Sequence, residues 1–497
     1  MTTMPRPPGP RDHAFGLRLL ADMQDDYLGF WRDAQRRYGD TVYMRQGWFH
    51  HYVFMHPDQM REALVDKAHA FIRYEQPIKV MRQLHGRSVM ITEGATWQRQ
   101  RRMLMPAFSP KRFDGYARQV TAAATDAFDA LQRADRIGSG TGLGNEVDVE
   151  HTMNMLAMDI ILRTMFGSKV AEDTAQIEQA IRTLAAIGYA EMFLPFAIPA
   201  WAPLPNQARK RQALRLLDGL VRGHIRERRA GLRGDADSGT DIGAHFGDDL
   251  LGMLLAARDD DGDGGALSDD EVRDQLMTIF LAGHETTATA LAWAAWALAA
   301  DPALAARVAA EADAMLGARA PQLADLARLP LLAGLVKETL RRYPPVPGVL
   351  MRRAIEDVHI GAWLVPKRSL VTLPFFVAHD DARWFPEPDR VDPARFDPHR
   401  QDDAGREPPR GAYMPFGAGP RVCIGNSFAA MEMTLVLAML VQRFTLTPAP
   451  GQAAPKAIMQ VTLRPAGGLR LLLNPRRPAP AVPAVVAAAV QGCPFHA

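Results

Sequence analysis

Apolar residues recur at three- and four-residue intervals through most of the middle of the chain, a spacing that puts them on one face of a helix. Gly- and Asp-rich stretches separate these patterns and are typical of surface loops. The pattern therefore predicts one helix after another, most clearly over residues 116–133, 153–166, 206–229 and 303–316.

Stretches that predict strands are short and scattered, which indicates small sheets at the periphery of a helical protein. We expect a mainly α fold in a single domain over residues 1–497, with a Pro-rich leader over 1–10 and an extended tail over 475–497. The strands are expected over residues 41–44, 52–55, 358–360, 370–373 and 469–473.

The longest predicted helix starts at Ser268, where Ser268 and Glu271 have the spacing of a capping box. It continues to Ala300, and Asp301 and Pro302 then begin the next helix. Its middle, residues 282–287, reads Ala-Gly-His-Glu-Thr-Thr among apolar neighbours. A glycine in a helix interior costs about 1 kcal/mol relative to alanine, so this stretch is a candidate functional site. A solvated stripe on one helix face is the alternative.

Composition excludes several classes of protein. With 47% hydrophobic and 23% charged residues, the chain of 497 residues is not a disordered or collagen-like protein. Its 58 Lys and Arg against 56 Asp and Glu leave a net charge of +2, so we expect no nucleic-acid binding through bulk charge.

Two cysteines, Cys423 and Cys493, cannot form a disulfide framework, and a reducing compartment is expected. The leader has no signal-peptide core, and the longest uncharged apolar run, residues 288–300, is shorter than the ~20 residues that span a bilayer. We therefore expect a cytoplasmic protein with no membrane span, and a monomer.

Cys423 lies in a Gly-punctuated loop, residues 416–425, directly before a predicted helix over 426–441. Backbone amides and the positive end of a helix dipole stabilise a thiolate at such a position. One cysteine cannot build a structural zinc or iron–sulfur site, so the geometry suits a single thiolate ligand. A buried, inert cysteine is the alternative.

The loop resembles the cysteine signature of the cytochrome P-450 superfamily, F-x-x-G-x-R-x-C-x-G. The central-helix segment 282–287 resembles the oxygen-activation motif of the same family, [AG]-G-x-[DE]-T-[ST]. Together they imply the triangular, mainly helical P-450 fold with a long central helix. The signature positions are Phe416, Gly419, Arg421, Cys423 and Gly425.

Further motifs follow in the family's order. Glu338 and Arg341 resemble its E-x-x-R motif, and Arg395 resembles the arginine of P-E-R-F, although Ala394 replaces the Glu. The resemblance implies that Glu338, Arg341 and Arg395 form a structural triad.

The resemblance also implies haem-propionate ligands. Trp97 and Arg101 match the W-x-x-x-R motif whose side chains hold one propionate, and their i, i+4 spacing puts them on one helix face. Arg352 is the expected ligand of the second propionate, with Arg353 as the alternative.

The chemistry implied is that of a haem-thiolate monooxygenase. Cys423 would be the axial ligand of haem b, with Phe416 and Arg421 beside the cofactor, and its thiolate would favour O–O cleavage. Gly283 would leave room for dioxygen, while Thr286 and Glu285 would deliver protons. A peroxide-driven peroxygenase and a non-catalytic haem sensor are the alternatives.

Electrons are expected from separate proteins, a ferredoxin or flavodoxin with an NAD(P)H-dependent reductase, because the chain has no flavin or iron–sulfur module. A basic docking patch for the electron carrier is expected, and it would consist of Arg99, Arg102, Lys111 and Arg112.

The resemblance favours the fatty-acid-hydroxylase-like branch and a hydrophobic substrate held by residues 71–90 and 192–204. Fatty acids are the first expected substrates, and terpenoids or steroids the next.

Overall fold

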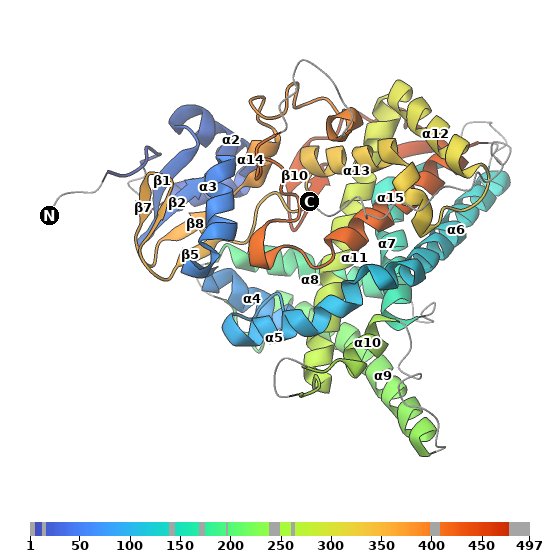
Figure 1. Ribbon diagram of the computed structural model, residues 1–497, viewed down its shortest axis with the longest axis horizontal. Coiled ribbons are helices and arrows are strands. Elements are labelled where there is room, and N and C mark those ends of the chain that lie inside the picture. The colour runs from blue at the N-terminus through green and yellow to red at the C-terminus, as the bar shows by residue number, and fades with distance from the viewer. Residues whose placement is uncertain are drawn as a thin grey trace. The chain divides into compact units, whose positions relative to one another are not determined.

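The predicted helices form close to their expected positions, because each has an apolar stripe that packs against a neighbouring element. The computed structural model describes residues 5–11, 16–138, 145–167, 174–194, 197–237, 249–259, 264–397 and 408–476 (Figure 1). The first four residues of the leader, residues 195 and 196, Cys493 and the tail from 477 onward lie outside this set.

The chain groups into two compact units, each assembled from separate segments. The first unit consists of Met1–Glu75, Gly334–Cys423 and Pro455–Gly467, and the second of Gln76–Ala333, Ile424–Ala454 and Gly468–Ala497. That the whole chain is one domain stays a prediction.

A five-stranded sheet organises the first unit, in the order β1-β2-β8-β5-β3. Strands β2 and β8 are parallel and the other neighbours are antiparallel. The sheet is formed by β1 (Thr41–Gln46), β2 (Phe49–Phe54), β3 (Phe71–Arg73), β5 (Arg352–Ala354) and β8 (Leu370–Thr372). The unit also contains α1 (Leu17–Asp25), α2 (Tyr27–Tyr38), α3 (Pro57–Arg61), α14 (Phe375–His379), β6 (Val358–Ile360), β7 (Trp363–Val365), β10 (Ala457–Met459) and β11 (Leu463–Pro465).

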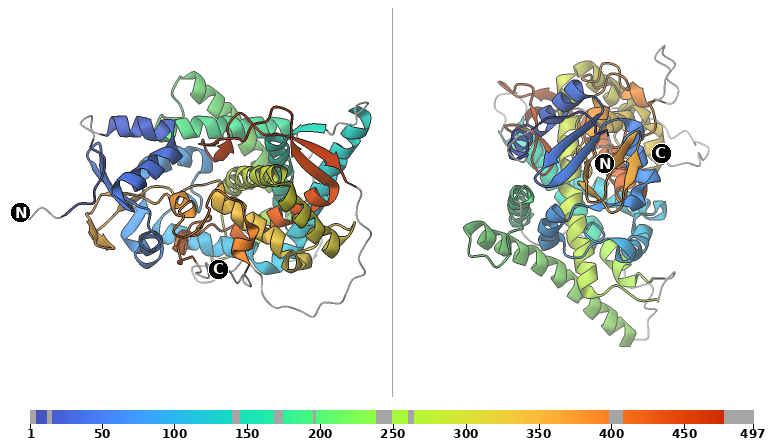
Figure 2. Two further views of the ribbon diagram at one scale, coloured as in Figure 1. Left: turned by 90° about the horizontal axis from the view of Figure 1, so that it is seen from above. Right: turned by 90° about the vertical axis from the view of Figure 1, so that its left-hand side faces the viewer.

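The second unit is mainly helical, and α11 (Asp269–Ala300) runs through it as one long helix packed against α7 (Val149–Phe166) (Figures 1 and 2). Leu276, Phe280 and Met158 lie in the core between these helices. The other elements are α5 (Gly94–Leu104), α6 (Phe113–Gly138), α8 (Thr174–Met192), α9 (Pro205–Asp237), α10 (Leu250–Ala256), α12 (Pro302–Leu316), α15 (Asn426–Arg443), β4 (Asn145–Asp148), β9 (Phe444–Pro448) and β12 (Arg470–Pro475). Helices α4 (Glu75–His85) and α13 (Pro330–Arg342) include residues of both units.

Both predicted ends of α11 are confirmed. The Glu271 N–H donates to Ser268 Oγ at 3.2 Å, and the Ser268 N–H donates to the Glu271 carboxylate at 2.9 Å. The helix ends at Ala300 because the Asp301 carboxylate accepts hydrogen bonds from the first backbone N–H groups of α12, whose first residue is Pro302.

No single helix among the described residues is both long enough and apolar enough to cross a bilayer. Helices α11 and α12 meet the length and composition requirement only when taken together, and the chain bends by 111° between them.

Four buried titratable groups make stability depend on pH. Burial lowers the pKa of His51 and His85 from 6.5 to about 4, and that of His379 to about 3. Burial raises the pKa of Glu432 from 4.5 to about 8. Between pH 4.5 and 6.5 the unfolded chain thus binds three more protons at the histidines, and one fewer at Glu432, than the folded protein does. Between pH 6.5 and 8 only the Glu432 difference remains.

We predict that the free energy of unfolding rises from pH 4.5 to 6.5 and falls from pH 6.5 to 8. Each proton of difference contributes about 1.4 kcal/mol per pH unit. Urea titrations at pH 5, 6.5 and 8 measure this, and Glu432→Gln should abolish the decrease on the alkaline side. Wild-type stability that keeps rising from pH 6.5 to 8 would contradict the prediction.

Candidate active site

The loop that carries Cys423 has a shape that requires glycine. Gly417 and Gly419 both have positive φ angles, 73° and 71°, which residues with a Cβ adopt at a cost. A Cβ on Gly419 would lie 1.9 Å from the carbonyl oxygen of Leu64. The Cys423 N–H donates to the Phe416 carbonyl at 3.0 Å, and this bond closes the loop. The Cys423 side chain is exposed, so the structure does not support the alternative of a buried, inert cysteine.

A buried ionic cluster in the same unit contains all three predicted triad residues. Arg341 donates two hydrogen bonds of 2.9 Å to the Glu338 carboxylate, and Arg395 Nε donates a third of 3.0 Å. Glu338 and Arg341 are fully buried. Arg341 also donates to the backbone carbonyls of His379 and Pro388, each at 2.7 Å. The cluster therefore joins α13 to two later segments of the chain.

His379 connects this cluster to the cysteine loop, a role that sequence reasoning missed. Its carbonyl accepts from Arg341, and its Nε2 accepts from the Met414 N–H at 3.0 Å. The Met414 carbonyl in turn accepts from the Gly417 N–H at 3.0 Å. Because burial, and secondarily Arg341, lower its pKa to about 3, His379 stays neutral and can accept. No motif in the sequence marks it.

The polar segment in the middle of α11, within the second unit, lies in unbroken helix. Thr286 Oγ1 donates to the Ala282 carbonyl at 2.8 Å, which leaves the oxygen lone pairs able to accept a further hydrogen bond. Glu285 is 5% exposed, whereas Thr286 is partly exposed. A Cβ on Gly283 would lie 3.3 Å from Ile161 Cδ1 of α7, so this position is tightly packed. His284 is buried and contacts the Phe280 carbonyl at 2.9 Å.

Helix α5 presents Trp97 and Arg101 together, with the guanidinium carbon 6.0 Å from the indole ring centroid. Two other arginines of the helix are neutralised within the second unit. Arg99 pairs with Glu271 at 2.8 Å, and Arg102 pairs with the buried Asp259 at 2.9 Å. The predicted docking patch is therefore wrong for Arg99 and Arg102, because acidic side chains of the protein itself offset their charge.

Strand β5 contains both candidate ligands of the second propionate, Arg352 and Arg353, and successive residues of a strand lie on opposite faces. Arg353 forms an ion pair with Glu75, including a 2.9 Å bond from Nε. Successive side chains of a strand point to opposite faces, so Arg352 faces away from that pair. Arg73 of β3 lies directly opposite Arg352 and shares its face. Two arginines on one face favour an anionic group there, and Arg73 could not be found without the strand register.

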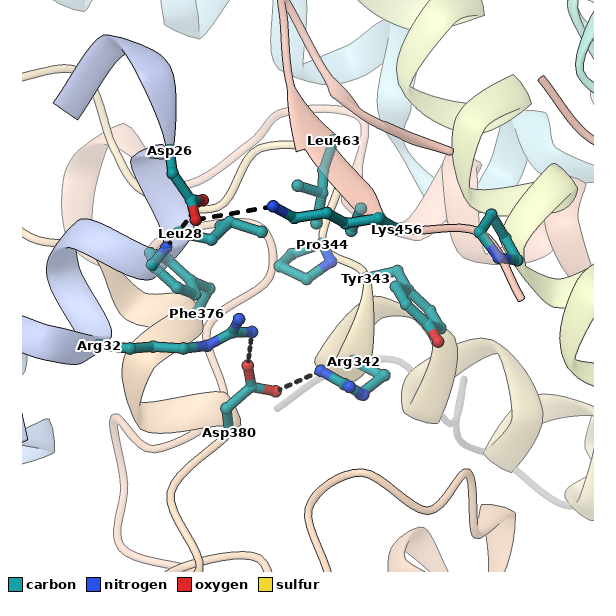
Figure 3. A pocket seen from close by; sticks show the side chains of 13 residues that line it. Asp26, Leu28, Arg32, Arg342, Tyr343, Pro344, Phe376, Asp380, Lys456 and Leu463 are labelled. Carbon is teal, nitrogen blue, oxygen red and sulfur yellow. Dashed lines mark hydrogen bonds and ion pairs between the residues drawn. The ribbon is translucent and has the colours of Figure 1, made fainter. Parts of the chain in front are cut away.

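A cavity of about 260 Å³ in the first unit contains none of the predicted site residues (Figure 3). Charged side chains line it in compensating pairs: Asp380 bonds both Arg32 and Arg342, and Asp26 lies 3.7 Å from Lys456. Asp380, directly after α14, thus joins α2 to α13, so we assign the cavity a structural role.

Comparison with known proteins identifies the chain. The cytochrome P-450 family model matches residues 7–472. The chain belongs to the cytochrome P-450 family. Cyclooctatin synthase of Streptomyces melanosporofaciens is 34% identical over 441 residues, which is 88% of this chain and 89% of that protein. Pentalenene oxygenase of Streptomyces avermitilis is 31% identical over 447 residues, 89% and 91% of the two chains. The crystal structure of the cytochrome P450DA heme domain matches with a TM-score of 0.80 and 26% identity over 95% of this chain and 98% of that one.

These matches confirm the mainly helical P-450 fold, and they show a cytochrome P-450 monooxygenase with a thiolate-ligated haem. Two features of this structure fit such a cofactor. The Cys423 thiol is exposed on a loop that requires glycine, and Arg73 and Arg352 lie opposite each other on one face of the sheet. The predicted preference for fatty acids is not supported, because the names of these relatives refer to cyclooctatin and pentalenene.

The opposite orientations of the two β5 arginines give a testable difference. We predict that Arg352→Gln speeds haem loss to apomyoglobin about tenfold, as expected for one lost charge-assisted hydrogen bond. Arg353→Gln, the matched control, should lose haem at nearly the wild-type rate because its partner is Glu75. Equal rates for the two variants would contradict this assignment.

Proposed function

We propose that this P-450 oxygenates a terpenoid, inserting one oxygen atom from dioxygen into a hydrophobic skeleton. The observation that carries the proposal is the similarity, over nearly the whole chain, to cyclooctatin synthase and pentalenene oxygenase, both from Streptomyces. A third relative, cyclooctat-9-en-7-ol 5-monooxygenase, is 34% identical over 422 residues. The names of these three relatives refer to cyclooctatin, cyclooctat-9-en-7-ol and pentalenene, which are terpenoid compounds.

We assign Cys423, whose side chain is exposed, as the residue whose thiolate would hold the haem iron, on the loop that also carries Phe416 and Arg421. Trp97 and Arg101 would bind one haem propionate, and Arg352 the other. This set is chemically consistent, because guanidinium groups form strong hydrogen bonds with carboxylates and a thiolate is a good ligand for iron.

Haem held by Cys423 would supply the chemistry of dioxygen activation, and residues of α11 would supply protons. Thr286 Oγ1 is anchored to the Ala282 carbonyl, so its position is fixed while its lone pairs stay available. Glu285, one residue earlier, is a buried carboxylic acid. We assign Thr286 to orient the proton donor and Glu285 to replenish it, which is a general-acid role.

Electrons are proposed to come from a ferredoxin or flavodoxin and its reductase. Of the four residues predicted for the docking surface, Arg99 and Arg102 are paired internally, while Lys111 and Arg112, in the short turn before α6, stay predicted members of it. Positive surfaces steer acidic electron carriers, which is the reason for proposing a basic docking surface. The cytoplasmic location and the monomeric state stay predictions.

Substrate titrations of the haem-loaded protein test the proposed substrate class. Polycyclic terpene hydrocarbons and alcohols should shift the haem absorption at micromolar concentration, while lauric and palmitic acids should bind at least tenfold more weakly. Turnover under ¹⁸O₂ should then place one labelled atom in the terpenoid product. Tight binding and oxidation of fatty acids without any terpenoid response would refute the proposal.

A further inference from the structure

Four polar side chains gather where α4, α8 and α9 meet within the second unit. Glu191, near the end of α8, and Gln207 and Lys210, in the first turns of α9, are all more than nine-tenths buried. Gln83 of α4 contacts them and is partly exposed. We call these four residues the α8–α9 cluster. Burial of a polar atom is costly unless the atom forms a hydrogen bond.

The hydrogen bonds of the cluster centre on the Glu191 carboxylate. Lys210 Nζ donates to Glu191 Oε2 at 2.7 Å, and Gln207 Nε2 donates to Glu191 Oε1. Lys210 Nζ also donates to Gln83 Oε1 at 3.0 Å. The carboxylate and the ammonium group neutralise each other, so the cluster has no net charge.

One acceptor and one donor of the cluster have no partner among the described residues. Gln207 Oε1 is buried and accepts no hydrogen bond. A lysine ammonium group has three N–H donors, and Lys210 has two acceptors for them. Gln207 and Lys210 are three residues apart on one face of α9 and both donate to Glu191, so the two unused groups are neighbours.

The surroundings of the cluster are apolar on one side and accessible on the other. Leu184, two turns before the cluster on the buried face of α8, belongs to an apolar core. Gln83 Nε2 donates to the Ile198 carbonyl at 3.0 Å, so the cluster connects the two segments expected to hold the substrate, residues 71–90 and 192–204. Because Gln83 is partly exposed and flexible, its side chain can turn aside to admit a ligand group.

We propose that the α8–α9 cluster binds a hydroxyl group of the substrate. The hydroxyl donates to Gln207 Oε1 and accepts from Lys210 Nζ, which satisfies both unused groups at once. This inference rests on the proposed function, because it adds a feature to the same terpenoid substrate.

Other polar groups fit the cluster less well. A carboxylate has no hydrogen to donate to Gln207 Oε1, and the Glu191 carboxylate repels it. A ketone has no hydrogen to donate either, and an ammonium group is repelled by Lys210. A hydroxyl both donates and accepts and adds no charge, so the cluster favours an alcohol over the acid or ketone of the same skeleton.

Titrations of the haem-loaded full chain with matched ligands test this. Cedrol, its parent hydrocarbon cedrane and cedryl methyl ether share a tricyclic terpene skeleton, and 1-dodecanol and dodecane share a linear one. The wild type should bind cedrol at least tenfold more tightly than cedrane, because a site built for a hydroxyl rejects the analogue that lacks it. Cedryl methyl ether, which keeps the oxygen but has no hydrogen to donate, should also bind at least tenfold more weakly than cedrol.

Gln207→Leu removes the unused acceptor and leaves the buried ion pair in place. It should weaken the binding of cedrol at least tenfold and change that of cedrane less than twofold. The matched control, Gln212→Leu on the exposed side of α9, should bind both ligands like the wild type. Lys210 is kept, because loss of one partner of a buried ion pair destabilises a fold strongly. The comparison of cedrol with its ether uses the wild type alone and does not depend on the folding of any variant.

Three results would overturn the inference. The first is a wild type that binds each hydrocarbon as tightly as its alcohol, or binds neither alcohol. The second is a preference for the alcohol that persists in Gln207→Leu. The third is an equal loss of affinity for alcohol and hydrocarbon in that variant, because Gln207 would then only support the fold. Failure of the proposed function looks different: the linear ligands bind and the terpenes do not, and the linear pair then measures the preference for the hydroxyl.

Discussion

Replacing Thr286 by alanine should lower product formation with dioxygen and electron donors at least tenfold, while turnover supported by hydrogen peroxide survives. The reason is that the Thr286 hydroxyl, anchored at 2.8 Å to the Ala282 carbonyl, is proposed to orient the proton donor. Proton delivery by a positioned group is typically worth ~10²–10⁴ in rate. Peroxide already carries its protons and both electrons, so its route depends less on this hydroxyl. Product and consumed NAD(P)H, measured together, give the coupling.

Thr286→Ser is the matched control, because it keeps the hydroxyl and removes one methyl group. It should restore most of the coupling. If the alanine variant formed product from dioxygen at the wild-type rate, the proton-relay assignment would fail. If the wild type turned over only with peroxide, the protein would be a peroxygenase, and if it turned over with neither oxidant, it would be a sensor.

Glu338→Ala should lower the free energy of unfolding by about 3–5 kcal/mol, the cost of leaving one partner of a buried ion pair uncompensated. Arg341 is fully buried and directs two hydrogen bonds at the Glu338 carboxylate, and Arg395 directs a third. Loss of the Glu338 carboxylate would leave Arg341 and Arg395 without their anionic partner, and the Arg341 side chain has no contact with solvent. Denaturant titration of the purified variant measures the loss.

Glu387→Ala is the control for this substitution, because the Glu387 side chain is 75% exposed and its pair with Arg390 lies at 3.5 Å. Exposed pairs contribute about 0–1 kcal/mol, so the control should change stability little. A variant lacking Glu338 that unfolds within 1 kcal/mol of the wild type would show that the cluster does not stabilise the fold.

Local patterns predicted the helices well, because helical periodicity and capping involve residues close in sequence. The predicted capping residue, Ser268, and the predicted last residue, Ala300, are those observed for α11, Asp269–Ala300. The helix expected over residues 426–441 is observed as α15, Asn426–Arg443. The contact between Trp97 and Arg101 was predictable for the same reason, since four residues separate them.

Strands and their pairing were less predictable. The five expected strands are found as β1, β2, β6, β8 and β12, but β3 and β5, only three residues each, have no pattern that distinguishes them from loops. Their register, which sets Arg73 opposite Arg352, depends on residues almost 280 positions apart. Sequence periodicity contains no information of that kind.

Motifs located the candidate site residues, but long-range partners decide which of them are available. Arg352 and Arg353 are equivalent in the sequence, and only the ion pair of Arg353 with Glu75 separates them. In the sequence, Arg99 and Arg102 have the pattern of surface cations. In the structure, Arg99 pairs with Glu271 and Arg102 pairs with Asp259.

We infer that Cys423 provides the thiolate ligand of the haem. The most direct measurement is the optical difference spectrum of the dithionite-reduced protein with and without carbon monoxide, recorded for the wild type and for Cys423→Ser. We predict a strongly red-shifted Soret band in the wild type and its absence in the variant. A band typical of histidine ligation in the wild type, or a red-shifted band that persists in Cys423→Ser, would contradict the assignment.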